Sequence, residues 1–219
     1  MAMKQWLQNS LLCKLFKNTG ILLSGNFTSS VISLISFTIS AKVLGVEQFG
    51  FLVLITTYVL IVDKLFNFQS WQALIKFGTE TLEKNRKDDF KSLIKFGFIL
   101  DVGTSVFGAL LATGCSWIIG EWIGFKEEHR VMAVAYSVTI LFNIYGTPIA
   151  ILRLFDQFRK TATQQVYTSI FKLIGVSIAV IFELGLWGFL LIWALTNILG
   201  NILLIYFSFK ELLNRKIFN

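Results

Sequence analysis

The sequence is poor in charged residues, histidine and cysteine, and each shortage excludes a class of protein. Charged residues make up 15% of the 219 positions, whereas soluble domains carry about 25%, so an ordinary soluble domain is excluded. One histidine and two cysteines leave no cluster with metal-ligand spacing. There is also no Gly-rich phosphate loop and no Ser/His/Asp set. We therefore predict a protein that is not an enzyme and that holds no cofactor and no metal.

Hydrophobic residues, in contrast, make up 55% of the chain. They gather in apolar runs of about 20 residues, the length of helix that crosses a bilayer. Six candidate spans cover residues 21–41, 49–68, 93–114, 131–152, 166–185 and 187–207. The predicted fold class is therefore all-α, a polytopic membrane protein with about six transmembrane helices.

The two ends of the chain differ from these spans. Residues 1–17 place apolar side chains near helical spacing with lysines between them, a pattern typical of a short amphipathic helix lying on an anionic membrane surface. The domain prediction is thus an interfacial helix at 1–17, a six-helix transmembrane lobe at 18–209 and a cytoplasmic tail at 210–219.

The cations of the predicted loops lie mostly on one side of the membrane. Cytoplasmic loops carry an excess of Lys and Arg. One set of alternating segments holds Lys4, Lys14, Lys17, Lys76, Lys84, Arg86, Lys87, Lys91, Lys95, Arg153, Arg159, Lys160, Lys172, Lys210, Arg215 and Lys216, while the opposite set holds only Lys42, Lys126 and Arg130. Both termini are therefore predicted to be cytoplasmic. The net charge of +7 is explained by this topology, so no nucleic-acid partner is expected.

Two single residues need an interpretation of their own. The lone His129 lies in the loop between the third and fourth predicted spans and is interpreted as a solvated loop residue. The only proline, Pro148, lies inside the fourth span. Because proline lacks an N–H and crowds the preceding turn, it loosens a helix locally. That loosening is either a hinge or a static kink.

Polar and charged residues inside the spans supply the candidate site. Intramembrane charges usually face a bundle interior or a watery cavity. We predict substrate-binding roles for Arg153, Lys172, Asp101 and Lys64, and a polar cavity face that includes Asn26, Asn143, Asn197 and Asn201. In this hypothesis Lys172 and Asp101 face one cavity, and Lys172 meets a phosphate with Arg153 at the mouth. The alternatives are that Lys172 extends to the membrane surface and that Asp101 pairs internally.

Several segments resemble one family of bacterial membrane proteins. AKVLGVEQFGFLVLITTYV contains an LG-x-x-x-F/Y-G turn between the first two spans. FQSWQALIKFG, LIKFGFILDVG and TPIAILRLFDQFRKTA follow in the same order. Together these segments resemble the polysaccharide and O-antigen flippases, a branch of the multidrug/oligosaccharidyl-lipid/polysaccharide exporter superfamily. The resemblance covers essentially the whole chain but only the N-terminal half of a family member.

The resemblance implies one lobe of a two-lobed exporter fold in the bacterial inner membrane. Family members move an undecaprenyl-pyrophosphate-linked oligosaccharide to the outer leaflet for O-antigen, lipopolysaccharide or capsule biosynthesis. The expected partners are the polyprenyl-linked oligosaccharide, the lipid bilayer and a second half or a homodimer. Two other functions stay open, a multidrug or cation exporter of the same fold and a non-transporting half or remnant.

Overall fold

The computed structural model describes residues 10–67, 70–118, 120, 122, 124–215 and 217. Within these residues every regular element is a helix, which confirms the all-α prediction. The elements are α2 (Ser10–Phe66), α3 (Trp71–Glu83), α4 (Lys87–Ile118), α5 (Glu127–Ser137), the 3₁₀ helix η1 (Val138–Phe142), α6 (Gly146–Leu154), α7 (Phe158–Ile181) and α8 (Gly185–Asn214).

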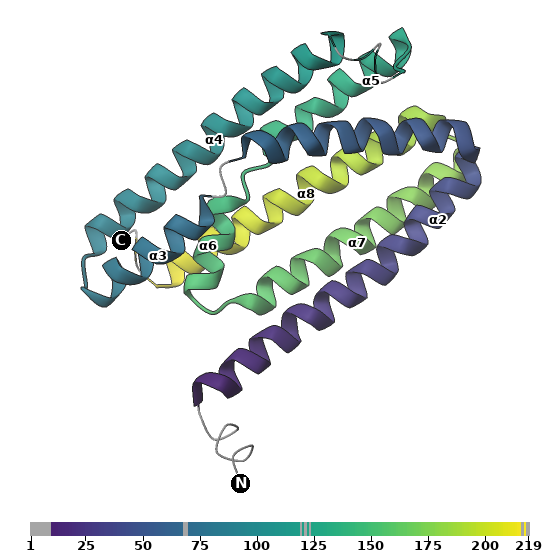
Figure 1. Cartoon of the computed structure of the whole chain (residues 1–219). Helices are drawn as coiled ribbons and strands as arrows, with labels where there is room; N and C mark the ends of the chain where they lie inside the picture. Colours follow the sequence, from purple (N-terminus) through teal and green to yellow (C-terminus); the bar gives the residue numbers. More distant parts are fainter. Residues whose placement is uncertain are drawn as a thin grey trace.

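The first two predicted spans are the two arms of α2. The helix folds back on itself at Gly45 (Figure 1), whose φ of 71° and ψ of 175° lie in a region essentially confined to glycine. Among the described residues, five helical segments are long and apolar enough to cross a membrane, and the first of them, Phe16–Phe66, contains both arms. The six predicted spans thus correspond to five segments because two spans share one bent helix.

The helices run back and forth between two ends of the bundle (Figure 1). The N-terminal arm of α2 packs on α7, and α7 packs on α8. The C-terminal arm contacts α4, α5 and α8. The start of α2, all of α3, the α6–α7 turn and the end of α8 lie at one end, while the Gly45 bend and the α7–α8 turn lie at the other. We call the first the cation-rich end, because most of the described members of the abundant cation set, such as Arg86, Arg159 and Lys210, belong to segments that lie there.

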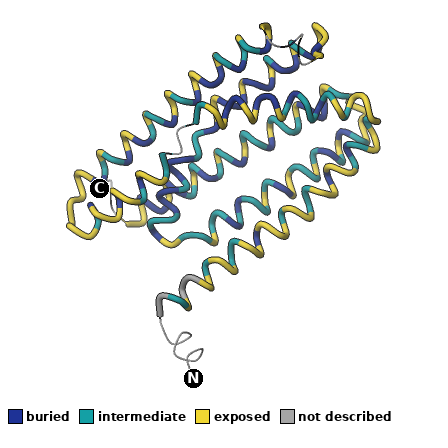
Figure 2. Tube along the Cα trace, viewed as in Figure 1, coloured by how far each residue is buried: buried dark blue, intermediate teal, exposed yellow. Residues whose placement is uncertain are grey.

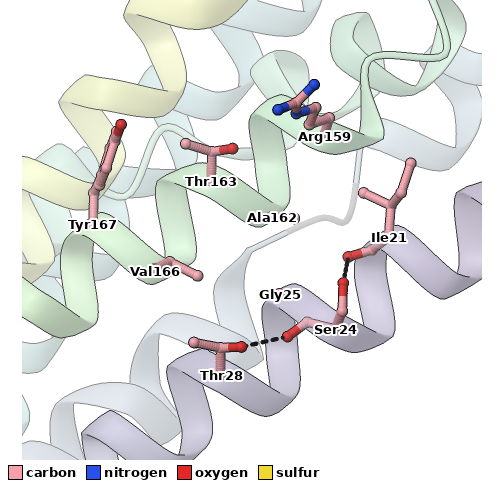
Figure 3. Close-up of a pocket in the computed structure, with 9 residues that line it drawn as sticks. All are labelled: Ile21, Ser24, Gly25, Thr28, Arg159, Ala162, Thr163, Val166 and Tyr167. Atoms are coloured by element: carbon pink, nitrogen blue, oxygen red, sulfur yellow. Dashed lines mark hydrogen bonds between the residues drawn. The ribbon is translucent and has the colours of Figure 1, made fainter.

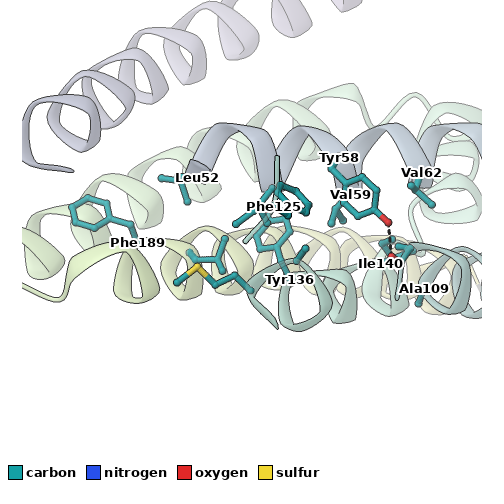
Figure 4. Packing of buried hydrophobic residues seen from close by; sticks show 14 of the residues in the cluster. Leu52, Tyr58, Val59, Val62, Ala109, Phe125, Tyr136, Ile140 and Phe189 are labelled. Carbon is teal, nitrogen blue, oxygen red and sulfur yellow. Dashed lines mark hydrogen bonds between the residues drawn. The ribbon is translucent and has the colours of Figure 1, made fainter. Parts of the chain in front are cut away.

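Most of the buried apolar side chains form one cluster between α2, α4, α5, α7 and α8 (Figure 4). It includes Leu52 and Ile55 from α2, Met132 from α5 and Phe189 from α8. The Tyr58 hydroxyl donates a hydrogen bond to the Ala112 carbonyl at 2.5 Å within the cluster. Lipid is as apolar as these side chains, so close van der Waals packing holds the helices together more than the hydrophobic effect does. The outward faces accordingly remain exposed (Figure 2).

A second, smaller cluster lies towards the cation-rich end. It joins Leu74 of α3 and Phe90 of α4 to Ile151 of α6 and Leu212 of α8. α8 continues to Asn214, so the predicted tail begins inside a packed helix rather than after it. At the other terminus, α2 runs without a break from Ser10 into the first span. Residues 1–9 of the predicted interfacial helix lie outside the described part of the chain.

The fourth predicted span is divided into α5, η1 and α6. Three residues, 143–145, separate η1 from α6, and Pro148 lies in the first turn of α6, where its missing N–H costs no helical hydrogen bond. The break therefore precedes the proline. His129, interpreted above as solvated, is 8% exposed and stacks on Phe51 with 3.5 Å between ring centroids. That interpretation was wrong because α5 begins two residues earlier and turns the ring against α2.

Candidate functional site

Three asparagines predicted for the polar face meet at the break between η1 and α6. Asn143 directly follows η1, while Asn197 and Asn201 lie one turn apart on α8. The Asn201 side-chain amide donates to the Asn143 side-chain oxygen at 2.8 Å and to that of Asn197 at 3.1 Å. Asn143 is 8% exposed. We call these three residues the amide cluster, and they place hydrogen-bonding groups where an unbroken helix would present none.

Asp63 extends this cluster and was missed as a site residue by the sequence analysis. It lies in the C-terminal arm of α2 and is 8% exposed, and the side chains of Asn143 and Asn67 lie beside its carboxylate. Its neighbour Lys64 points the other way and is exposed, as expected of adjacent helical residues about 100° apart. A signal was present, because Asp63 is a carboxylate surrounded in sequence by apolar residues.

Asp101 has both carboxylate oxygens engaged within the protein. Its Oδ1 accepts a hydrogen bond from the Ser70 hydroxyl at 2.6 Å, and its Oδ2 accepts one from the Thr147 backbone N–H at 2.7 Å. The residue is 4% exposed. A carboxylate at the first turn of α6 satisfies an N–H that has no helical partner and faces the positive end of the helix dipole. Asp101 was predicted either to face a substrate cavity or to pair within the protein, and these two hydrogen bonds correspond to internal pairing.

The structure does not bring Asp101 to Lys172. Lys172 lies on α7 and Asp101 on α4, and α8 lies between these helices (Figure 1). The Lys172 ammonium is instead 3.5 Å from the centroid of the Trp193 ring on α8. Across the described residues, no carboxylate lies within ion-pair distance of this ammonium. The indole N–H of Trp193 is also buried without a hydrogen-bond acceptor.

This pairing leaves a positive charge inside a membrane span with only an aromatic ring as its partner. A cation over a tryptophan face gains roughly 0.5–2 kcal/mol, which is less than the roughly 2.5–3.5 kcal/mol that a lysine costs at the centre of a span on insertion scales. The remaining cost can be offset by the membrane surface or by an anionic ligand. Lys172 is half-buried, so both remain accessible to it.

The other predicted site residues lie apart from Lys172. The Arg153 guanidinium, in the last turn of α6, lies 4.4 Å from the centroid of the Trp71 ring on α3. Lys64 is exposed in the last turn of α2, and Asn26 is exposed on its N-terminal arm, away from the amide cluster. The fold thus distributes the predicted site residues over several places along the bundle.

Lys160 and Arg215, two cations at the cation-rich end, both form ion pairs with one buried carboxylate. Glu211 of α8 is 5% exposed and accepts from the Lys160 ammonium at 2.5 Å and from the Arg215 guanidinium at 2.7 Å. Lys160 therefore links the start of α7 to the end of α8. This role is structural, and Lys160 is not among the residues predicted to bind substrate.

Comparison with known proteins supports the resemblance noted in the sequence. Residues 15–219 match the model of a family described as "Polysaccharide biosynthesis protein". The chain belongs to this family. It is also 26% identical over 216 residues to "Inner membrane protein YghQ" of Escherichia coli (strain K12), an alignment that covers 99% of this chain and 61% of that protein. The chain thus spans about three fifths of the length of this relative. No solved structure matches this chain.

Family membership fits the architecture described above. The match begins in the first turns of α2 and includes every later helix, so the bundle as a whole is the family's and not an added module. The chain is therefore a multi-pass membrane protein of a polysaccharide biosynthesis family.

Proposed function

We propose that the protein translocates an undecaprenyl-pyrophosphate-linked oligosaccharide across the bacterial inner membrane, for the biosynthesis of a surface polysaccharide such as O-antigen, lipopolysaccharide or capsule. The observation that carries this proposal is Lys172, a cation inside a span with no carboxylate partner among the described residues. Intramembrane charges of this kind mark pathways for charged substrates. A pyrophosphate is the anionic part of the proposed substrate and would complete the environment of this ammonium.

Other residues support parts of the same substrate. The amide cluster offers donors and acceptors that match sugar hydroxyls. Arg153 packs against Trp71 near the cation-rich end, and its planar guanidinium can bind two phosphate oxygens at once. The exposed Lys64, the sequence neighbour of Asp63, adds a further positive charge. Asp101 acts indirectly, since it holds the start of α6 in place.

Orientation and partners belong to the proposal as well. The excess of cations at one end favours a cytoplasmic location for that end and for both termini. Two-lobed transporters place their substrate between two halves, and the relative from Escherichia coli is longer than this chain. We therefore propose that a second half, in the same polypeptide or in a second copy, closes the pathway.

A multidrug or cation exporter is the less favoured function. Such a transporter needs buried carboxylates that are available to a cationic ligand. Here both oxygens of Asp101 are engaged within the protein, while Lys172 remains without an anionic partner. Asp63 likewise has side-chain amides beside its carboxylate, whereas the described residues offer the Lys172 ammonium only an aromatic ring, and this difference favours an anionic substrate.

The proposal is tested by gene deletion and complementation in the source bacterium. Deletion is expected to abolish the surface polysaccharide and to accumulate its lipid-linked precursor in the inner leaflet. Wild-type protein and K172R restore export, while K172Q reduces it at least about tenfold at an equal membrane level, because one charge-assisted contact is lost. The matched control is K42Q, which removes a lysine from the opposite end. Unchanged polysaccharide after deletion, or full export by K172Q, would contradict the proposal.

A further inference from the structure

A hydroxyl-lined pocket with one arginine lies between the N-terminal arm of α2 and the start of α7 (Figure 3). Its volume is 480 Å³, within the roughly 300–1,000 Å³ range of ligand pockets. The lining residues are Ile21, Ser24, Gly25, Thr28, Arg159, Ala162, Thr163, Val166 and Tyr167. No carboxylate is among them. The pocket lies at the cation-rich end because Arg159 is in the first turn of α7.

The hydrogen-bond donors of the pocket lie in one row along α7. Arg159, Thr163 and Tyr167 are spaced four residues apart (Figure 3), so they share one face of the helix. Within the described part of the chain, none of the three has a hydrogen-bonding or ion-pair partner for its side chain. On α2, in contrast, the Ser24 and Thr28 hydroxyls donate to carbonyls of their own helix. The α7 side of the pocket therefore presents a guanidinium and two hydroxyl groups that are available as hydrogen-bond donors. An anionic group with several acceptor oxygens would match them.

The two helices that form the pocket are held at a fixed separation. A Cβ built on Gly25 would lie 2.5 Å from the Ala162 Cβ and 3.0 Å from its Cα, so glycine is required for this approach. Just deeper in the bundle, the Ser33 and Ser169 hydroxyls lie 3.2 Å apart and hydrogen-bond the same two helices. The pocket is thus a built feature of the α2–α7 interface and not a gap between loosely placed helices.

An apolar groove adjoins the pocket through Tyr167. It lies between α7 and α8, has a volume of 460 Å³ and is lined by Tyr167, Thr168, Phe171, Leu199, Ile202, Leu203 and Tyr206. Tyr167 lines both cavities. Moving along α7 away from Arg159, the lining changes from cation and hydroxyls to aromatic and aliphatic side chains. Phe171, Leu199 and Ile202 are each more than 40% exposed, so the groove is open at the outer face of the bundle.

From this arrangement we propose that the pocket and groove bind one anionic glycerophospholipid of the surrounding leaflet. The phosphate headgroup contacts Arg159, Thr163 and Tyr167 at the membrane surface, and an acyl chain follows Phe171 and Leu199 towards the bilayer interior. Basic pockets between transmembrane helices on the cation-rich side suit phospholipid headgroups. The polar part lies at the end of the helix and the apolar part lies deeper, which is the order that a bilayer lipid requires.

This site is distinct from the substrate residues proposed above. Lys172 contacts α8 through Trp193, whereas Arg159 lines the α2–α7 pocket. The neighbouring Lys160 differs too, because its ammonium is committed to Glu211. The two adjacent cations in the first turn of α7 therefore have different functions, one joining α7 to α8 and the other available to a lipid.

Native mass spectrometry of the full-length protein in mild detergent tests the proposal. The protein is incubated with phosphatidylglycerol or with phosphatidylcholine of the same acyl chains, and retained lipid is counted. Wild type is expected to retain phosphatidylglycerol preferentially. R159Q lowers this retention about tenfold, the loss expected of one charge-assisted contact, and R159K recovers part of it. The matched control is R86Q, which removes an exposed arginine paired with Asp89 near the same end and leaves retention unchanged.

Further variants separate the headgroup site from the groove. L199W fills the groove without changing the charge, so it lowers retention of both lipids. T163V and Y167F each remove one hydroxyl while keeping the shape, and each lowers the preference for phosphatidylglycerol even if R159Q does not fold. Equal retention by wild type and all of these variants would overturn the proposal. Preferential retention of undecaprenyl phosphate over phosphatidylglycerol would overturn it as well, since the pocket would then belong to the lipid-linked substrate.

Discussion

The backbone N–H of Thr147 donates to Asp101 Oδ2 at 2.7 Å and so joins α4 to the first turn of α6. This contact lies just after the break in the fourth span, where the backbone has lost its helical partners. The second oxygen of Asp101 accepts from Ser70 at the start of α3. One buried carboxylate therefore holds together three segments at the point where the bundle is least regular.

Replacing Asp101 with asparagine should destabilise the protein by about 1–3 kcal/mol. An amide of the same shape keeps one acceptor but places an N–H₂ where the other acceptor was, so either Thr147 or Ser70 is left unpaired. The measurement is unfolding in detergent, by heat or by titration with a denaturing surfactant. The matched control is D88N, since Asp88 is 96% exposed and forms only a long surface ion pair, 3.5 Å, with Lys91. Equal stability of the two variants would show that the Asp101 contacts contribute nothing.

The sequence predicts the class of the fold well and the position of the break poorly. Apolar runs are a strong signal because lipid leaves few alternatives to the helix. Pro148 drew attention to the right segment, but the break lies before it, at residues 143–145. Asp63 shows the same limit, because a carboxylate near a span end is interpreted as interfacial until the packing of α2 against the break is known.

Pairing between distant residues is the other part that sequence could not provide. Lys172 and Asp101 have opposite charges and both lie inside predicted spans, which suggested a shared cavity. Their separation follows from the order of helices, since α8 packs on α7 and lies between them. Arg159 and Lys160 are indistinguishable as loop cations, and only Glu211, far away in the sequence, gives one of them a partner.

Replacing Gly45 with alanine should destabilise the bend of α2 by about 1–3 kcal/mol. The cause is conformational alone, because a Cβ at this position meets nothing within 4 Å while φ is +71°. Gly50 provides the control. It lies in the same helix, also has open space around its Cβ and has no positive φ, so G50A should be neutral or slightly stabilising. Thermal unfolding of both variants in one detergent makes the comparison, and a neutral G45A would contradict the strained geometry.

Replacing Glu211 with glutamine should destabilise the cation-rich end by about 1–3 kcal/mol. The carboxylate is almost fully buried and is shared by Lys160 and Arg215, so the neutral amide leaves both cations without their partner. Combining E211Q with K160Q in a double-mutant cycle should give a smaller loss than the sum of the two single variants. E80Q on α3 is the control, because the Glu80–Lys84 pair is solvent-exposed and should contribute no measurable stability. Additive losses in the cycle would mean that Lys160 and Glu211 do not interact.

Asn201 and Asn26 test how far the fold changes what the sequence suggested. Both were predicted for one polar face, but Asn201 bonds to Asn143 and Asn197 at the break, whereas Asn26 is exposed on the N-terminal arm of α2. N201L should cost about 1–3 kcal/mol, since the interhelical hydrogen bond to Asn143 contributes roughly 0.6 kcal/mol and the side chains of buried Asn143 and half-buried Asn197 would also lose their donor. N26L should leave unfolding in detergent unchanged. If the proposed transport role of the amide cluster is correct, N201L also lowers export of polysaccharide in complementation more than N26L does. Equal behaviour of the two variants in both measurements would remove the distinction that the structure draws between them.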